Sequence, residues 1–63
     1  MWVFVEEAWR ECRFGQWRVL ITCQKGDWVE SFFLYFNDIE PTPDALQGKV
    51  DEFLLLHNTE ENP

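Results

Sequence analysis

The sequence predicts a small α+β domain, in which a three-stranded antiparallel meander is followed by one C-terminal helix packed on one face of the sheet. Three observations predict this β-β-β-α order. Residues 17–24 and 28–36 are rich in β-branched and aromatic residues, and the Gly-containing turn signal KGD separates them. Residues 2–13 alternate as a strand does. From Pro43 onward, the apolar residues recur with a helical period.

The two segments around KGD are expected to form the central hairpin. A two-residue loop at Lys25 and Gly26 would place Cys23 opposite Trp28. Because neighbouring strand residues point to opposite faces, we expect the core on the face that carries Trp17, Val19, Ile21, Cys23, Trp28, Phe32 and Leu34. The other face is mixed but still notably apolar, with Arg18, Leu20, Thr22, Val29, Ser31, Phe33 and Tyr35.

The N-terminal segment is expected to form the third strand, joined to the hairpin through FGQ at 14–16. One of its faces would carry Val3, Val5 and Trp9, and the other Trp2, Phe4 and Ala8. A short helix over residues 5–13 is the alternative. A strand fits better, because a two-stranded sheet alone is only marginally stable in water.

The helix is expected to run from Pro43 to about His57. Thr42 suits the N-cap and Pro43 the first helical position, and Asp44 lies at the positive end of the helix dipole. One apolar stripe would face the sheet, formed by Leu46, Val50, Phe53, Leu54 and His57.

These elements predict one domain over residues 1–57 and a polar C-terminal tail over 58–63. Gly48 lies inside the expected helix, where glycine costs about 1 kcal/mol relative to alanine. Either another backbone approaches closely at this position, or the glycine is simply tolerated.

A helix of about 15 residues is roughly 22 Å long and covers one face of a three-stranded sheet. The second face would then remain open, and contiguous apolar patches of this kind mark interaction sites. We expect it to expose Leu20, Val29, Phe33 and Tyr35, with Trp2 and Phe4 as further candidates. The alternative is that the N-terminal segment, or the aliphatic stem of Arg18 and its neighbours, shields this face.

A basic and aromatic segment, WRECRFGQWR at 9–18, lies at one hairpin end and resembles the arginine and tryptophan hot spots of protein interfaces. Leu55, on the helix side away from the apolar stripe, is a weaker candidate. The residues expected to bind a partner are therefore Leu20, Val29, Phe33, Tyr35, Trp9, Arg13, Arg18 and Leu55.

Charge and motifs exclude several classes of function. The net charge is −7, which argues against direct binding to nucleic acid or to an anionic membrane, since both require clustered Lys and Arg. No run approaches the ~18 apolar residues of a membrane span. The sequence has no GxSxG, CxxC or HxxxH motif. We therefore expect no enzyme activity, no metal or other cofactor and no small-molecule substrate.

The two cysteines, Cys12 and Cys23, bear on the compartment. The sequence starts without a basic, signal-like segment, which favours a cytoplasmic protein with both thiols reduced. A disulfide between the two cysteines across a hairpin is the alternative.

The expected function is a non-catalytic protein–protein interaction module that acts through the apolar and aromatic sheet face. It would work as a homodimer or docked on a larger protein. This size and composition are typical of small accessory, regulatory or inhibitor proteins, including those of phages and mobile elements. The alternative is an acidic inhibitor or nucleic-acid mimic that occupies a basic nucleic-acid-binding groove of a target protein.

Overall fold

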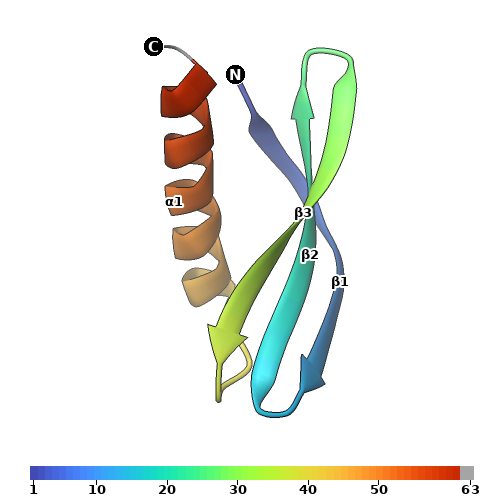
Figure 1. Cartoon of the computed structure of the whole chain (residues 1–63), viewed down its shortest axis with the longest axis vertical. Helices are drawn as coiled ribbons and strands as arrows, with labels where there is room; N and C mark the ends of the chain where they lie inside the picture. The colour runs from blue at the N-terminus through green and yellow to red at the C-terminus, as the bar shows by residue number, and fades with distance from the viewer. Residues whose placement is uncertain (62–63) are drawn as a thin grey trace.

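Three antiparallel strands and one helix form two layers (Figure 1). The structure is a computed structural model that describes residues 1–61. Strands β1 (Val3–Arg13), β2 (Gln16–Lys25) and β3 (Trp28–Asn37) form one sheet in the order β1-β2-β3. Helix α1 (Pro43–Glu61) packs against one face of this sheet. The predicted β-β-β-α architecture is confirmed, and the N-terminal segment is a strand rather than a short helix.

The β2–β3 turn differs from the expected one. Lys25 pairs with Trp28, so the loop is formed by Gly26 and Asp27, and Cys23 lies opposite Glu30 instead of Trp28. A register shift of two residues leaves every side chain on its predicted face, because side chains alternate with a period of two. It does move Trp28 to the tip of the hairpin.

The prediction that Trp28 belongs to the core is therefore wrong. Its side chain is 65% exposed, and its indole Nε1 donates a hydrogen bond of 3.1 Å to Glu30 Oε2.

Strand β1 contains two irregularities, between Phe4 and Glu6 and between Glu7 and Trp9. Each inserts one extra residue, and a β-bulge of this kind switches the face of the residues that follow. The second bulge restores the original alternation, so Trp9 lies on the same face as Val3, as expected. Between the bulges the faces are exchanged, which places Glu6 on the face away from α1 and Glu7 on the face toward it.

The core lies between the sheet and α1. Its centre is formed by three side chains along β2, those of Val19, Ile21 and Cys23, each with no exposed surface. Trp2, Leu34 and Val50 complete the buried cluster. The predicted helical stripe faces this core, with Val50 buried and its other four members half-buried.

Aromatic side chains line the edge of this core. Phe32 contacts both Trp2 and Phe53, with ring centroids 5.6 Å and 4.9 Å away. Trp2 and Phe4 both pack here, which removes them from the candidates for the open face.

The start of α1 follows the capping expected from the sequence. The Ala45 amide donates to Thr42 Oγ1 at 3.1 Å, and the Leu46 amide donates to the Thr42 carbonyl at 2.9 Å. Thr42 is therefore the N-cap.

The helix continues to Glu61, beyond the expected end at about His57. Asn58, expected in a polar tail, holds the N-terminus instead. The Trp2 amide donates to Asn58 Oδ1 at 2.6 Å, and Asn58 Nδ2 donates to the Trp2 carbonyl at 3.1 Å. The start of β1 and the end of α1 therefore lie at the same end of the molecule (Figure 1). The remainder of the predicted tail, residues 62–63, lies outside the described residues.

The two cysteines are free thiols, Cys12 exposed and Cys23 buried. Cys12 pairs with Trp17 on β2, six positions from Cys23, a separation of about 20 Å along a strand. A disulfide requires Cα atoms less than about 7 Å apart. A bridge between them within this fold is therefore excluded.

Glycine substitutions test the backbone analysis. A Cβ at Gly48 or at Gly26 would meet no other atom within 4 Å, but Gly26 has a φ of +59°. We expect Gly48→Ala to raise the free energy of unfolding by about 1 kcal/mol through helix propensity. Gly26→Ala should lower it by about 1–2 kcal/mol because of the left-handed backbone. Urea denaturation measures both variants, and equal effects would contradict this account.

Thiol labelling tests the packing of β2. Burial raises the pKa of the Cys23 thiol, which further disfavours the reactive thiolate. We expect a thiol reagent to modify one cysteine per chain rapidly and the second only as the protein unfolds. In a Cys12→Ser variant the rapid phase should disappear. A rapid phase that persists in this variant would show that Cys23 is accessible.

Candidate protein interface

The face of the sheet away from α1, here called the open face, is defined by the strand register. It carries five cross-strand rows, each with one residue from β1, β2 and β3 in that order. From one end of the sheet to the other the rows are Val3–Gln24–Val29, Glu6–Thr22–Ser31, Trp9–Leu20–Phe33, Glu11–Arg18–Tyr35 and Arg13–Gln16–Asn37.

Four side chains in the middle of this face form an aromatic–arginine cluster: Trp9, Arg18, Phe33 and Tyr35. The Arg18 guanidinium carbon lies 5.3 Å from the Phe33 ring centroid and 5.8 Å from that of Trp9. Trp9 meets Phe33 edge-on at 6.3 Å, and Phe33 lies 6.3 Å from Tyr35. The cluster therefore extends across all three strands.

The position of Arg18 is set by charge as well as by the rings. Its Nη2 donates to Glu11 Oε1 in the same cross-strand row. Its Nε is buried and has no hydrogen-bond partner among the described residues. A buried donor without a partner destabilises the fold, and cation–π attraction between the Arg18 guanidinium and two rings offsets part of this penalty.

Shielding by Arg18, the alternative considered from the sequence, is incomplete. The guanidinium covers one side of the rings, yet Trp9, Phe33 and Tyr35 remain 42%, 43% and 45% exposed. Leu20 beside them is half-buried, and Val29 is exposed. The N-terminal segment does not cover this face, because Trp2 packs on the opposite one. An apolar surface therefore remains accessible in the middle of the sheet.

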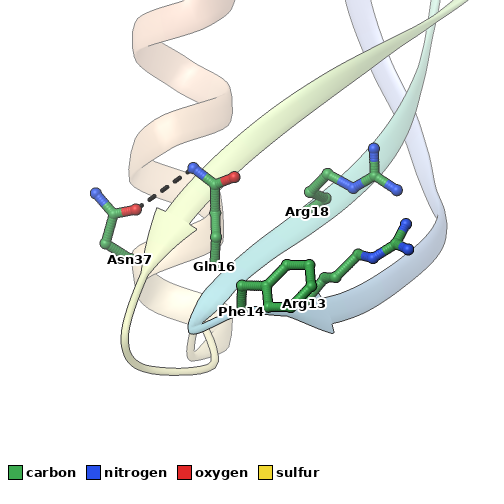
Figure 2. Close-up of a pocket in the computed structure, with 5 residues that line it drawn as sticks. All are labelled: Arg13, Phe14, Gln16, Arg18 and Asn37. Atoms are coloured by element: carbon green, nitrogen blue, oxygen red, sulfur yellow. Dashed lines mark hydrogen bonds between the residues drawn. The ribbon is translucent and has the colours of Figure 1, made fainter.

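A hollow of about 450 Å³ adjoins this cluster at the β1–β2 turn (Figure 2). Its lining includes two guanidinium groups, those of Arg13 and Arg18. Gln16 and Asn37 lie on its other side and are joined by a 3.4 Å hydrogen bond. The turn residue Phe14 completes it, 5.7 Å from the Arg13 guanidinium. These groups can hold a carboxylate or a carbonyl of a partner, but they include no nucleophile or general base.

The structure brings together seven of the eight residues predicted to bind a partner. Leu20, Val29, Phe33, Tyr35, Trp9, Arg13 and Arg18 all lie on the open face. Leu55 does not join them, because it lies on the layer formed by α1, where its side chain is 67% exposed.

The open face also contains two acidic residues, Glu6 and Glu11, that were not among the residues predicted to bind a partner. Alternation along the strand could have identified Glu11, because it follows Trp9 by two positions. Glu6 reaches the open face only through the bulge that follows Phe4, which no feature of the sequence indicated.

A second group of charges lies on the covered face beside the β3–α1 loop. Arg10 forms two hydrogen bonds of 2.5 Å with Glu7, and its Nη1 donates to Glu40 at 2.9 Å and to the Pro41 carbonyl at 3.3 Å. The hydrogen bond from Arg10 lowers the pKa of Glu7, and the same pairing raises the pKa of Arg10. This group fastens the loop before α1 to β1 and has a structural role.

Other chemistry finds little support in residues 1–61. No group of three or more His, Cys, Asp and Glu side chains converges there as a metal site would require. His57 stacks on Phe53 at 3.9 Å and lies 5.4 Å from Phe32, so it packs as part of the core edge. No helix within this range has the length and apolarity needed to cross a membrane.

Comparison of the chain with protein-family models, with curated proteins and with solved structures gave no significant match.

Acid titration tests the group around Arg10. Because the pKa of Glu7 is lowered in the folded state, its pairing stabilises the fold above about pH 4.3, the ordinary value for glutamate. Between this pH and the lowered pKa of Glu7, the unfolded chain binds a proton that the folded chain does not. The stabilisation therefore decreases as the pH falls, and it is lost once the pH is below the lowered pKa. We expect the unfolding temperature of Glu7→Gln to depend less on pH, from about pH 4.3 downward, than the unfolding temperature of the wild type.

The control for this titration is Glu52→Gln, which removes one carboxylate from an exposed position of α1. It should retain the wild-type pH dependence in the window where Glu7→Gln loses it. If both variants follow the same curve, Glu7 does not contribute as described.

Proposed function

We propose that this chain is a non-catalytic protein–protein interaction module that acts through the open face of its sheet. It works as a homodimer or docked on a larger protein. The observation that carries the proposal is the aromatic–arginine cluster, which stays exposed across three strands although the centre of the other face of the same sheet is buried under α1. Contiguous exposed apolar patches mark interaction sites.

The residue types support the same function. Tryptophan, tyrosine and arginine are enriched among the hot spots of protein interfaces, where rigid rings contribute contact area at a low cost in conformational entropy. Here Trp9, Arg18 and Tyr35 lie on one surface and are already held together by Phe33. A preorganised surface loses less freedom on binding than a flexible one, which favours affinity.

The distribution of charge also supports association. Of the twelve acidic residues in the chain, only Glu6 and Glu11 lie in the rows of the open face. Arg13 and Arg18 also lie on the open face. The two negative and two positive charges of this face therefore sum to zero, on a molecule of net charge −7. A low share of Asp and Glu, together with enrichment in arginine and aromatic residues, is typical of protein interfaces.

A regulatory or inhibitory role in the cytoplasm is the setting we propose for this module. The side chains that line the hollow include no nucleophile or general base, so the effect on a partner would come from occupancy. The free thiols of Cys12 and Cys23 agree with a reducing compartment.

An acidic inhibitor that mimics a nucleic acid has less support. Such a protein requires carboxylates aligned along one face. On α1 the exposed Asp44, Asp51 and Glu52 lie within a surface that also presents Leu55 and Leu56, and Asp51 accepts a hydrogen bond from Gln47 at 2.8 Å. Binding to a basic target that weakens steeply with salt would favour this alternative.

The test compares two charge insertions of the same kind. Phe33→Asp places a carboxylate in the open face, and Leu55→Asp places one on α1, where the side chain is also exposed. The measurement is the molar mass of each variant in solution, both as purified protein and in extracts of cells that make it.

We expect Phe33→Asp to weaken association by at least about thirtyfold, corresponding to a hot spot of about 2 kcal/mol. Leu55→Asp should behave as the wild type. Circular dichroism checks that both variants remain folded. If the wild type is monomeric in both settings, or if Phe33→Asp leaves its assembly unchanged, the open face is not the interface.

A further inference from the structure

We infer that the occupant of the open face is a second copy of this chain, packed face to face about a two-fold axis that runs across the strands. This inference rests on the proposed function and identifies its partner. The observation behind it is the placement of two unpaired charges of opposite sign. Glu6 lies near one end of the open face and Arg13 at the other end, and neither forms an ion pair with another described residue.

The register gives the geometry. On β2, the partners of Glu6 and Arg13 are Thr22 and Gln16, six residues or about 20 Å apart. A two-fold axis in the plane of the interface, crossing the strands midway between them, exchanges the two ends of the face. Glu6 of each copy then lies opposite Arg13 of the other, so one contact is made twice, as two-fold symmetry requires.

The middle of the face fits the same arrangement. The midpoint falls between the row that contains Phe33 and the row that contains Tyr35. The axis therefore places Phe33 of one copy over Tyr35 of the second copy, and aromatic pairs of this kind add about 0.5–1.5 kcal/mol beyond the area they bury. The incoming Glu6 reaches the hollow beside the turn, where Arg13 and Arg18 offer guanidinium donors.

Self-association has to overcome the repulsion between two chains of net charge −7. Face-to-face packing reduces this repulsion, because each α1 lies on the far side of its own sheet. Two packed sheets are about 10 Å apart, and each helix adds a further layer outward. The exposed acidic side chains of the two helices are thus separated by more than the Debye length of about 8 Å at physiological ionic strength.

The dimensions of the open face set the area available for contact. Three strands of ten or eleven residues extend over about 33 Å by about 14 Å, along the longest dimension of the molecule, which is 36 Å. These dimensions give about 460 Å² of flat area, which corresponds to the small end of specific interfaces rather than to the roughly 800 Å² per partner of standard ones. Pairing through the free edge of β3 would leave the aromatic–arginine cluster exposed, which is why we favour contact through the face.

Charge exchange tests the arrangement with purified protein. A dimer of Glu6→Arg would bring the introduced arginine against Arg13 of the second copy twice. A dimer of Arg13→Glu would bring the introduced glutamate against Glu6 twice. Each variant alone should therefore dimerise at least about tenfold more weakly than the wild type. An equimolar mixture of the two should form a heterodimer close to wild-type affinity, because both contacts then join opposite charges. Sedimentation velocity measures all of these species.

A general charge effect predicts a different result. Glu6→Arg changes the net charge from −7 to −5, since −7 + 2 = −5, which would strengthen self-association through lower repulsion. The proposed contact weakens it. The double variant Glu6→Arg/Arg13→Glu keeps the net charge and should recover the dimer.

Several outcomes would overturn the inference. If the variants dimerise as the wild type does and the mixture gains nothing, the copies meet in another way, such as edge to edge through β3 or with the two-fold axis along the strands. If the purified wild type stays monomeric while Phe33→Asp abolishes a complex seen in extracts, the partner is a different protein. The proposed function then stands without the dimer. If Phe33→Asp has no effect in either setting, both proposals fail.

Discussion

One helix has to cover a sheet whose two faces are both apolar, and the rest of the structure depends on this constraint. The β2 side chains of Val19, Ile21 and Cys23 are completely buried because α1 lies over them. A domain of about this size buries only about 60% of the surface of its unfolded chain. No second layer is left for the opposite face, where Trp9, Phe33 and Tyr35 stay exposed.

The choice between the two faces is made by contacts at both ends of α1. Asn58 bonds to both backbone polar groups of Trp2 at one end. At the other end, Arg10 holds the loop before α1 through Glu40 and the carbonyl of Pro41. These contacts all act on the same side of the sheet, so they keep the helix away from the open face. The position of the exposed cluster on the open face therefore follows from how the helix is anchored.

Association links this asymmetry to function. The open face combines exposed rings with a balanced set of charges, whereas most acidic residues of the chain lie on α1 and in the turns. A surface of this kind can approach another without strong repulsion, and burial of its rings supplies the free energy of binding. The positions of Glu6 and Arg13 then provide a reason for one orientation of a second copy over others.

The sequence by itself determined the order of the elements, the inward and outward faces of β2 and β3, and the cap at Thr42, because these follow from local periodicity and local hydrogen bonding. The common face of seven of the eight residues predicted to bind a partner also followed from the sequence, since alternation along strands is a local property. Three features were decided only by the folded structure: the two-residue shift that exposes Trp28, the helix end held by Asn58, and the bulge after Phe4 that brings Glu6 to the open face. Each depends on the free energy of pairing between two segments, which the residue pattern of either segment alone does not reveal.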